Sequence, residues 1–340
     1  MFSWQLIVTI IVYLHLPTSL HGYELVEDFS GATFFDKWDF YGHWDNLTLG
    51  KCSHSLSLVG GLRLYRTDPS EQRLAYTNER GNAIIKVDNT SNVPWNEKRN
   101  TVRLTSQRAY DFGTIWIANI MHLPFGCSVW PALWTMGTDW PHDGEIDMPS
   151  GCTVFESKLF SFGANFGASG GGIWAVQFDV AGIWYWARGM IPPSVLNSDS
   201  TSSIPYIGDW GNPSASFLST ESCNITEFFG PQRLVLDITL CGTWASLPEL
   251  YLPQCASSGP AGYLDNVVGP GERYNDAYFE IPYIRTYTTQ AGMAPTVPTP
   301  TPTPSGVAAS DLDPSAAQAG EPVAGPGLRD VVGPAAAGLR

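Results

Sequence analysis

The sequence predicts an all-β fold, a two-sheet antiparallel β-sandwich, and three observations lead to that prediction. Apolar and polar residues alternate with a period of two in many short runs, which is the pattern of strands with one buried face. Glycine (34 residues) and proline (26 residues) are frequent, so turns are frequent as well. No run shows the period of a long amphipathic helix. Many short strands separated by turns are typical of a sandwich.

The clearest predicted strand is Leu234–Leu240. Its even-numbered residues are all Leu or Ile, and its odd-numbered residues are Val235, Asp237 and Thr239. Period-two runs also predict strands at Ala83–Val87, Thr101–Thr105, Thr114–Met121, Val129–Thr135, Ile173–Phe178 and Tyr278–Tyr287. Pro282 interrupts the last of these runs. Because proline has no backbone N–H to donate, we expect a sheet edge or a bulge there.

The two ends of the chain differ from its middle. Residues 1–22 have the pattern of a signal peptide, since their apolar run Leu6–Leu16 is too short to span a bilayer. Three Asn-X-Ser/Thr sequons, at Asn46, Asn89 and Asn224, also fit secretion. Residues 290–340 are rich in Pro and Thr, then in Ala and Gly, which predicts a disordered tail. The folded domain is therefore expected at 23–289, in a secreted protein for which cell-wall association is an open alternative.

Charge and cysteine content limit the partners. The net charge of −14 and the pI near 4.7 disfavour nucleic acid and anionic membranes, because both would repel the chain. The six cysteines form no Cys-X-X-Cys pair, so we expect neither a metal site nor any cofactor. In an oxidising compartment they would form disulfides. We expect a Cys223–Cys241 bridge, with Cys255 either near Cys127 or free, and a monomeric chain.

The candidate chemistry lies at Gly144–Asp147. On a strand, Glu145 and Asp147 share a face because they are two residues apart. Paired carboxylates together with aromatic platforms are what glycoside hydrolysis requires. The three tryptophans just upstream, Trp130, Trp134 and Trp140, are candidate sugar-binding residues. The alternative is a solvated strand end, with Trp130 and Trp134 in the core.

The sequence resembles glycoside hydrolase family 16, and specifically its fungal laminarinase-like branch. The matching motifs are Gly81–Asp88, Asn96–Asn100, Phe125–Ala132, Gly144–Asp147, Ser161–Phe166, Gly170–Trp174, Arg188–Pro192, Leu240–Trp244 and Asn275–Ile281. The resemblance implies a β-jelly-roll sandwich of the concanavalin A-like type. It also implies cleavage of β-1,3- or mixed β-1,3(1,4)-glucan with retention of the anomeric configuration.

The resemblance assigns Glu145 as the nucleophile and Asp147 as the carboxylate between the two catalytic groups. It places the general acid/base at position 150, which is a serine here, and a hydroxyl is a poor acid at mild pH. The motif around Ser150–Thr153 lies well downstream of the catalytic strand in the family. A segment carrying the acid/base is therefore missing, through a gene-record error, a splice variant or a real loss. Asp143 and Glu156 are the candidate replacements, although both are more typical of surface carboxylates.

Three functions follow from these observations. The first is a retaining endo-β-1,3(4)-glucanase whose activity is weakened or lost in this form. The second is a non-catalytic, lectin-like β-glucan-binding protein, which the missing carboxylate favours. The third is a structural wall protein with a stalk, for which the Pro/Thr tail is the only support.

Overall fold

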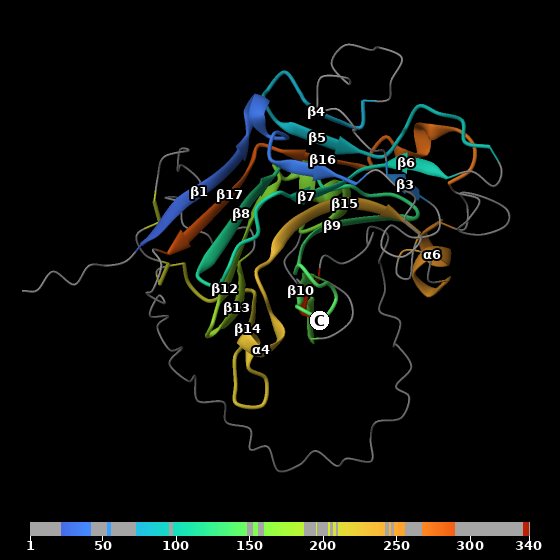
Figure 1. Cartoon of the computed structure of the whole chain (residues 1–340). Coiled ribbons are helices and arrows are strands. Elements are labelled where there is room, and N and C mark those ends of the chain that lie inside the picture. Colours follow the sequence, from blue (N-terminus) through green and yellow to red (C-terminus); the bar gives the residue numbers. More distant parts are fainter. Residues whose placement is uncertain are drawn as a thin grey trace, which may run out of the picture.

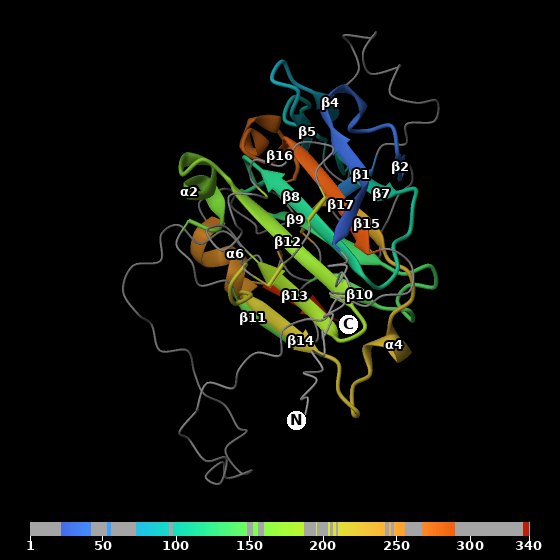
Figure 2. The ribbon, with the colours of Figure 1, turned by 90° about the vertical axis from the view of Figure 1, so that its left-hand side faces the viewer.

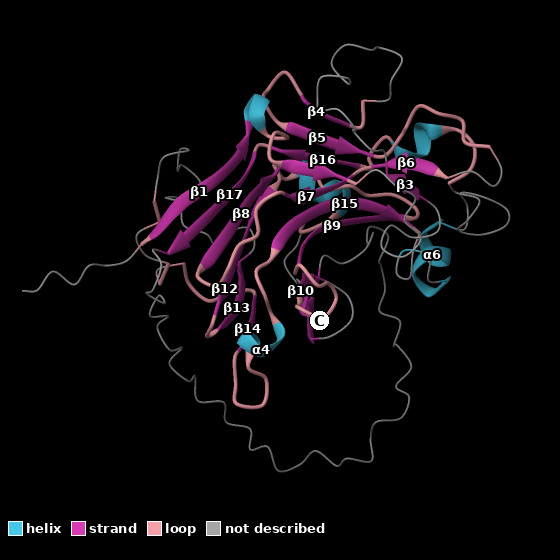
Figure 3. Ribbon diagram, in the orientation of Figure 1, coloured by secondary structure: helices cyan, strands magenta, loops and turns pink. Residues whose placement is uncertain are grey.

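The computed structural model of the chain describes residues 22–41, 53–55, 73–94, 98–147, 152–155, 160–186, 195, 203–204, 207–208, 210–241, 245, 248–255, 267–289 and 336–339. The expected signal peptide lies outside the described residues apart from Gly22. So does the expected tail apart from its last strand. The described part consists mainly of strands, as Figure 3 shows.

Two large sheets form the body of the molecule (Figures 1 and 2). The six-stranded sheet has the order β1 (Tyr23–Ser30), β17 (Tyr283–Thr289), β8 (Thr114–Ile120), β12 (Gly172–Asp179), β13 (Gly182–Trp186) and β14 (Ala215–Leu218). The seven-stranded sheet has the order β11 (Cys152–Phe155), β18 (Ala336–Leu339), β10 (Glu145–Asp147), β9 (Val129–Met136), β15 (Arg233–Leu240), β7 (Arg103–Ser106) and β2 (Trp38–Phe40). The strand pairs recorded within both sheets are antiparallel, which confirms the predicted fold class.

The main hydrophobic core lies between these two sheets. The six-stranded sheet contributes Trp116, Ala118, Ile120, Phe178, Ile183 and Ile284, and the seven-stranded sheet contributes Val129, Ile146, Leu234, Leu236, Ile238 and Leu240. The even-numbered residues of β15 therefore face the core, as the period-two pattern predicts. Burial of this apolar surface is the main stabilising contribution to the sandwich.

The opposite face of the six-stranded sheet is buried as well. Ile115, Ile117, Ile173, Trp184 and Trp186 form a second cluster there. Val195, Ile204 and Trp210 belong to the same cluster and come from outside the strands of the sheet. Strand β8 is consequently apolar on both faces, and its alternation is weaker than that of β15.

Smaller elements complete the described part of the chain. A three-stranded sheet contains β16 (Tyr278–Ile281), β5 (Ala83–Lys86) and β4 (Ala75–Thr77), and β3 (Ser53–Ser55) pairs in parallel with β6 (Arg99–Thr101). The helices are short: α2 (Gly163–Ala168), α4 (Ile225–Phe228), α6 (Pro248–Cys255) and the 3-10 turns η1 (Gly31–Thr33) and η4 (Gly271–Tyr274). The run Tyr278–Tyr287 divides at Pro282, where the chain passes from the three-stranded to the six-stranded sheet.

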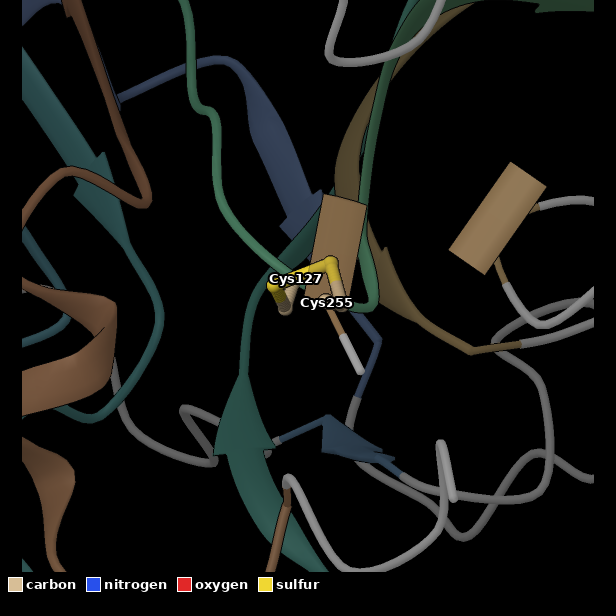
Figure 4. The surroundings of a disulfide bond; sticks show 2 residues. All are labelled: Cys127 and Cys255. Atoms are coloured by element: carbon tan, nitrogen blue, oxygen red, sulfur yellow. A yellow bond between two sulfur atoms is a disulfide. The ribbon is translucent and has the colours of Figure 1, made fainter. Parts of the chain in front are cut away.

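The disulfides differ in part from expectation. Cys127 is bonded to Cys255, which is one of the two alternatives expected for Cys255; their Cα atoms are 5.7 Å apart (Figure 4). The expected Cys223–Cys241 bridge is wrong, because Cys223 is a free, exposed thiol and Cys241 is bonded elsewhere. Cys223 precedes β15 and Cys241 follows it, and this strand alone spans about 27 Å. Cys223 and Cys241 are both near β15 in the sequence, but this does not make them close to each other in space.

Four residues of the stretch expected to be disordered form a strand. Strand β18 (Ala336–Leu339) pairs with β10 on one side and with β11 on the other. Gly338 lies opposite Asp147 in β10 and opposite Thr153 in β11. A position one strand wide therefore lies between β10 and β11, and β18 occupies it. The backbone N–H and C=O groups of β10 and β11 that face this position offer hydrogen bonds to β18.

Candidate active site

The candidate site lies on the face of the seven-stranded sheet that is turned away from the core, called the outer face below. On β15 the core-facing residues are even-numbered, so Val235, Asp237 and Thr239 belong to the outer face. Their partners in β9 are Trp134, Ala132 and Trp130, respectively. The alternation of β9 and β15 thus aligns two of the predicted tryptophans on one face.

Glu145 is the first residue of β10 and is 2% exposed. Its partner in β9 is Met136, which belongs to the same face as Trp134 by strand alternation. The indole Nε1 of Trp140 donates a hydrogen bond of 2.5 Å to Oε2 of Glu145. Because this carboxylate is buried, the indole N–H satisfies one of its oxygens and limits its orientation.

The ring of Trp140 also packs against Trp134. Their ring centroids are 6.3 Å apart and the rings are inclined at 61°, an edge-to-face arrangement. The guanidinium of Arg103, in β7, lies 5.3 Å from the centroid of Trp134 and 5.4 Å from that of Tyr41, distances at which a cation is attracted to a ring. Glu145, Trp140, Trp134, Arg103 and Tyr41 therefore form one continuous cluster.

A buried glutamine anchors the start of β10. Gln232 is fully buried, accepts a hydrogen bond from Oγ1 of Thr135 at 2.8 Å, and donates to the carbonyls of Asp143 (2.9 Å) and Gly230 (3.0 Å). Thr135 Oγ1 in turn accepts from the amide of Ile146 at 3.3 Å. This network links β9 and β10 to Gln232, the residue directly before β15. Gln232, Thr135 and Ile146 are buried and paired, so they hold the start of β10 in a defined position.

Asp143 lies in the turn before β10 and not in the strand. Gly144 has φ +92°, a conformation that side chains disfavour, and a Cβ there would lie 2.3 Å from the ring of Phe229. Asp143 Oδ2 accepts from the amide of Asp139 at 2.7 Å, within the turn. Asp143, a candidate replacement for the acid/base, is therefore held within the turn, and the strand begins only at Glu145.

The other predicted site residues are placed as follows. Trp140 and Trp130 are half-buried, whereas Trp134 is 7% exposed and largely covered. Trp130 lies four residues from Trp134 on the same face of β9, about 13 Å along the strand. Asp147 ends β10, two residues after Glu145. Ser150 and Glu156 lie outside the described residues.

Two charged residues of the outer face were not singled out from the sequence. Arg103 lies opposite Asp237 in the pairing of β7 with β15, and both are buried, at 6% and 3% exposure. Such residues are rarely buried unless they are paired, so their burial marks a functional or structural role. The signal was present in the alternation, since Asp237 is an acidic residue in the middle of a strand rich in Leu, Ile and Val. Only the register between β7 and β15 showed that Arg103 lies opposite Asp237.

The described residues contain no group of three His, Cys, Asp or Glu side chains arranged to hold a metal ion. No helix in the same part of the chain has the length and apolar content needed to cross a membrane.

Comparison with known proteins identifies the family. The family model described as XgeA-like, catalytic GH16 domain, matches residues 38–150 and 148–287. The two matched pieces meet at 148–150, directly after the strand that carries Glu145. Collinearity with the family is therefore interrupted at that point and maintained on either side of it.

Curated relatives come from fungi. A probable glycosidase of Schizosaccharomyces pombe is 29% identical over 314 residues, which cover 78% of this chain and 69% of that protein. The endo-1,3(4)-beta-glucanase xgeA of Emericella nidulans is 27% identical over 82% of this chain and 49% of its own length. A probable endo-1,3(4)-beta-glucanase of Aspergillus clavatus is 27% identical, and this chain covers 52% of it. The chain thus spans about half the length of these two glucanases.

Solved structures show the same fold. Laminarinase 16A from Phanerochaete chrysosporium, solved with β-glucans in donor and acceptor sites, superposes with a TM-score of 0.65 at 22% identity and covers 78% of this chain and 99% of its own. An elongating family 16 β-1,3-glucosyltransferase gives a TM-score of 0.62 at 28% identity, over 78% of this chain and 100% of its own. The fold is therefore the jelly-roll sandwich of these enzymes, and the chain belongs to glycoside hydrolase family 16, with an XgeA-like catalytic domain.

Proposed function

We propose that this chain binds β-1,3- or mixed β-1,3(1,4)-glucan and that Glu145 is a nucleophile that attacks the anomeric carbon, with overall retention. The observation that carries this proposal is the hydrogen bond from Trp140 to the buried carboxylate of Glu145. A carboxylate held in one orientation is suited to form a glycosyl-enzyme intermediate. The names of the fungal relatives, which are endo-1,3(4)-beta-glucanases, support this substrate class.

The aromatic residues of the outer face supply the binding surface in this proposal. Trp130 and Trp140 are half-buried, which leaves part of each ring exposed to stack on a sugar. Trp134 is buried, and its ring packs against the ring of Trp140 and against the guanidinium of Arg103. Asp147 lies one strand repeat beyond Glu145, where the family resemblance places the carboxylate between the two catalytic groups.

We further propose that the general acid/base is absent, so that polymer hydrolysis is very slow. Two observations support a missing segment: the family match is interrupted at 148–150, and the sheet has a one-strand position between β10 and β11 that the C-terminal strand fills. The retaining mechanism requires two carboxyl groups about 5–5.5 Å apart. Asp143 is held in the turn. Asp237 lies opposite Ala132, four residues along β9 from the partner of Glu145, which is roughly 13 Å.

The test exploits this incomplete catalytic pair. An aryl β-glucoside oligomer with an activated leaving group needs little protonation, so it should form a glycosyl-enzyme on Glu145 that accumulates because no general base activates water. Mass spectrometry of the intact protein should detect the adduct, and azide should release it as a β-glycosyl azide. Glu145→Gln should abolish adduct formation, whereas Asp143→Asn, as the matched control, should retain it. Brisk hydrolysis of laminarin by the unmodified chain would refute the missing acid/base.

A non-catalytic, lectin-like role is the second candidate, favoured by the same missing carboxylate. It predicts that laminarin retards the chain in affinity electrophoresis while no adduct forms with the activated glycoside. Trp130→Ala should weaken that retention under both candidates, so adduct formation decides between them. Loss of retention without change in the circular dichroism spectrum would place Trp130 in the binding surface.

We also propose that the chain is secreted through its N-terminal segment 1–22, that residues 290–335 form an extended stalk, and that the domain is monomeric. The apolar run Leu6–Leu16 and the sequons support secretion. Expression of the full chain in a fungal host should yield protein in the medium that begins near Tyr23. Chain retained in the cytosol would contradict the proposal, and light scattering of the secreted protein would measure its oligomeric state.

A further inference from the structure

The end of the sandwich that carries α4 exposes large apolar side chains. Phe228 in α4 is 52% exposed, Leu218 at the end of β14 is 51% exposed, and Val180 in the turn between β12 and β13 is 43% exposed. The amide of Ser219 donates to the carbonyl of Ala181 at 2.9 Å, which joins the β14 end to that turn. The amide of Ile225, the first residue of α4, donates to Oγ of Ser219 at 3.2 Å, which joins α4 to the same end of β14. Exposed apolar side chains gathered at one end mark a surface that a partner group covers.

A sequon begins directly before α4. Asn224 caps the helix, and its Oδ1 accepts from the amide (3.3 Å) and from Oγ1 (2.9 Å) of Thr226, the hydroxyl residue of the sequon. Its Nδ2 donates to Glu227 at 3.2 Å in a solvent-exposed bond. Only one N–H of the amide is used there. Nδ2 therefore has a second hydrogen whose replacement leaves both cap contacts through Oδ1 intact.

Phe228 follows Asn224 by four residues across a single helical turn. Asn224 caps the helix from outside it, and Phe228 lies about one turn, roughly 6 Å, further along the helix axis. A sugar attached to Nδ2 of Asn224 would thus lie beside the exposed ring of Phe228. The flat, apolar face of a pyranose is a suitable cover for an aromatic ring.

The second sequon in the described chain, at Asn89, has a different environment. Nδ2 of Asn89 donates to Oδ1 of Asn275 at 2.8 Å, and its Oδ1 accepts from Lys86 at 2.6 Å. The amides of Thr90 and Ser91 both donate to Asp88. A Cβ on Gly271 would come within 2.3 Å of the carbonyl carbon of Asn89, so the two backbones are in contact. The amide of Asn89 thus bridges to Asn275, far along the chain, whereas the amide of Asn224 contacts only Thr226 and Glu227 of its own helical turn.

From these contacts we propose that Asn224 carries an N-linked glycan whose first N-acetylglucosamine covers Phe228. In the transfer step, Nδ2 loses one proton and forms a bond to C1 of the sugar. The C1–O bond to a polyprenyl diphosphate carrier breaks, and the diphosphate leaves with its electron pair. The oligosaccharide carried on that lipid diphosphate is the co-reactant. The proposal rests on the proposed entry into the secretory pathway and is independent of any catalytic activity.

The test uses a glycosylating fungal host and the full chain, expressed with and without an added host secretion leader, so that entry into the pathway is ensured in one arm. Peptide mass spectrometry after an endoglycosidase that leaves one sugar should find a single N-acetylhexosamine on Asn224. Thr226→Ala should remove it and Thr226→Ser should retain it. Failure of secretion without the added leader would concern the signal peptide alone. An unmodified Asn224 in protein secreted with the leader would refute the proposal.

A stability comparison then tests the contact with Phe228. An amidase that removes the whole glycan converts Asn224 to Asp, which is an equally good helix cap, so any loss of stability is not a loss of capping. Relative to protein that retains one sugar, the amidase product should melt about 2–4 °C lower, the shift expected for one lost aromatic contact in a domain of this size. In Phe228→Ala the difference should shrink to the part that arises because a carboxylate at position 224 cannot donate to Glu227. Equal melting of the two forms in the unsubstituted chain would refute the contact.

Discussion

Nε1 of Trp140 lies 2.5 Å from Oε2 of Glu145, so one side chain of the turn before β10 holds the carboxylate that begins this strand. Glu145 is 2% exposed, whereas Trp140 is half-buried. A charge-assisted hydrogen bond of this kind is stronger than a neutral one and fixes direction as well as distance. Two residues separated by five positions thus define the orientation of the proposed nucleophile.

Substitution of Trp140 by Phe should separate these roles. The substitution keeps an aromatic ring beside Trp134 and removes the N–H that binds Glu145. We expect adduct formation with an activated aryl glycoside to slow about 10- to 100-fold, because loss of a hydrogen bond to a charged group costs about 1.5–3 kcal/mol. Retention by laminarin should change little. An unchanged rate of adduct formation, measured by stopped-flow release of the aryl alcohol, would show that the indole N–H does not orient the nucleophile.

Substitution of Gln232 by Ala should destabilise the domain without touching the substrate face. Three partners would lose a hydrogen bond, namely the buried hydroxyl of Thr135 and the partly buried carbonyls of Asp143 and Gly230. We expect the free energy of unfolding to fall by about 1–3 kcal/mol, as measured by urea denaturation. Gln107 is exposed and serves as the matched control, since Gln107→Ala should change stability little. If both substitutions had equal effects, the buried network would not stabilise the start of β10.

His122 should make stability depend on pH. Burial lowers the pKa of His122, which outweighs the opposite effects of the Tyr278 carbonyl and of Asp276 and Glu280. The unfolded chain, with a histidine pKa of about 6.5, then binds the proton more readily than the folded chain. The stabilising contribution is therefore complete above that pH and is lost as the pH falls through the lower folded-state pKa.

Replacement of His122 by Phe keeps a ring stacked on Tyr278, whose centroid is 3.8 Å away, and removes the titrating group. We expect a shallower decline of the melting temperature below about pH 6.5 than in the unsubstituted chain. His142 is exposed, and His142→Gln provides the control. The measurement is a series of thermal melts from about pH 4.5 to about pH 8. This range extends roughly two units below and one and a half units above the ordinary histidine pKa. Parallel curves for the unsubstituted chain and His122→Phe would contradict the assignment.

Removal of residues 290–340 should expose the strand position between β10 and β11. Strand β18 pairs with both of them, so its loss leaves two unpaired edges beside Glu145. We expect faster amide hydrogen exchange in β10 and β11 and a tendency to self-associate, measured by mass spectrometry and light scattering. Gly338→Pro should produce the same exchange in the full-length chain, because proline at a paired position removes a donor. A shorter truncation at residue 320 also removes β18. If the effect comes from β18, this truncation should have the same effect as removal of residues 290–340.

Much of the fold follows from local patterns in the sequence. The alternation in Leu234–Leu240 gave the core face of β15 correctly, and Gly144–Asp147 contained the short strand β10. Pro282 marked the place where one apolar run divides between two sheets. Side-chain alternation and the lack of a proline N–H act within one strand, so the sequence expresses them directly.

Long-range register decided the rest. It placed Arg103 opposite Asp237, although 134 positions separate them, and it joined Cys127 to Cys255 rather than Cys223 to Cys241. Asp143 is held in the turn before β10, where Gly144 has a positive φ, and the same turn brought the indole N–H of Trp140 to the carboxylate of Glu145. These relationships depend on which strands become neighbours, a property of the whole sheet. The sequence by itself determined which residues form strands and which face of each strand is apolar. The tertiary structure alone decided which polar side chains meet. Hydrogen bonds and ion pairs form only within about 3–4 Å, and the packing of distant strands is what brings their polar groups that close.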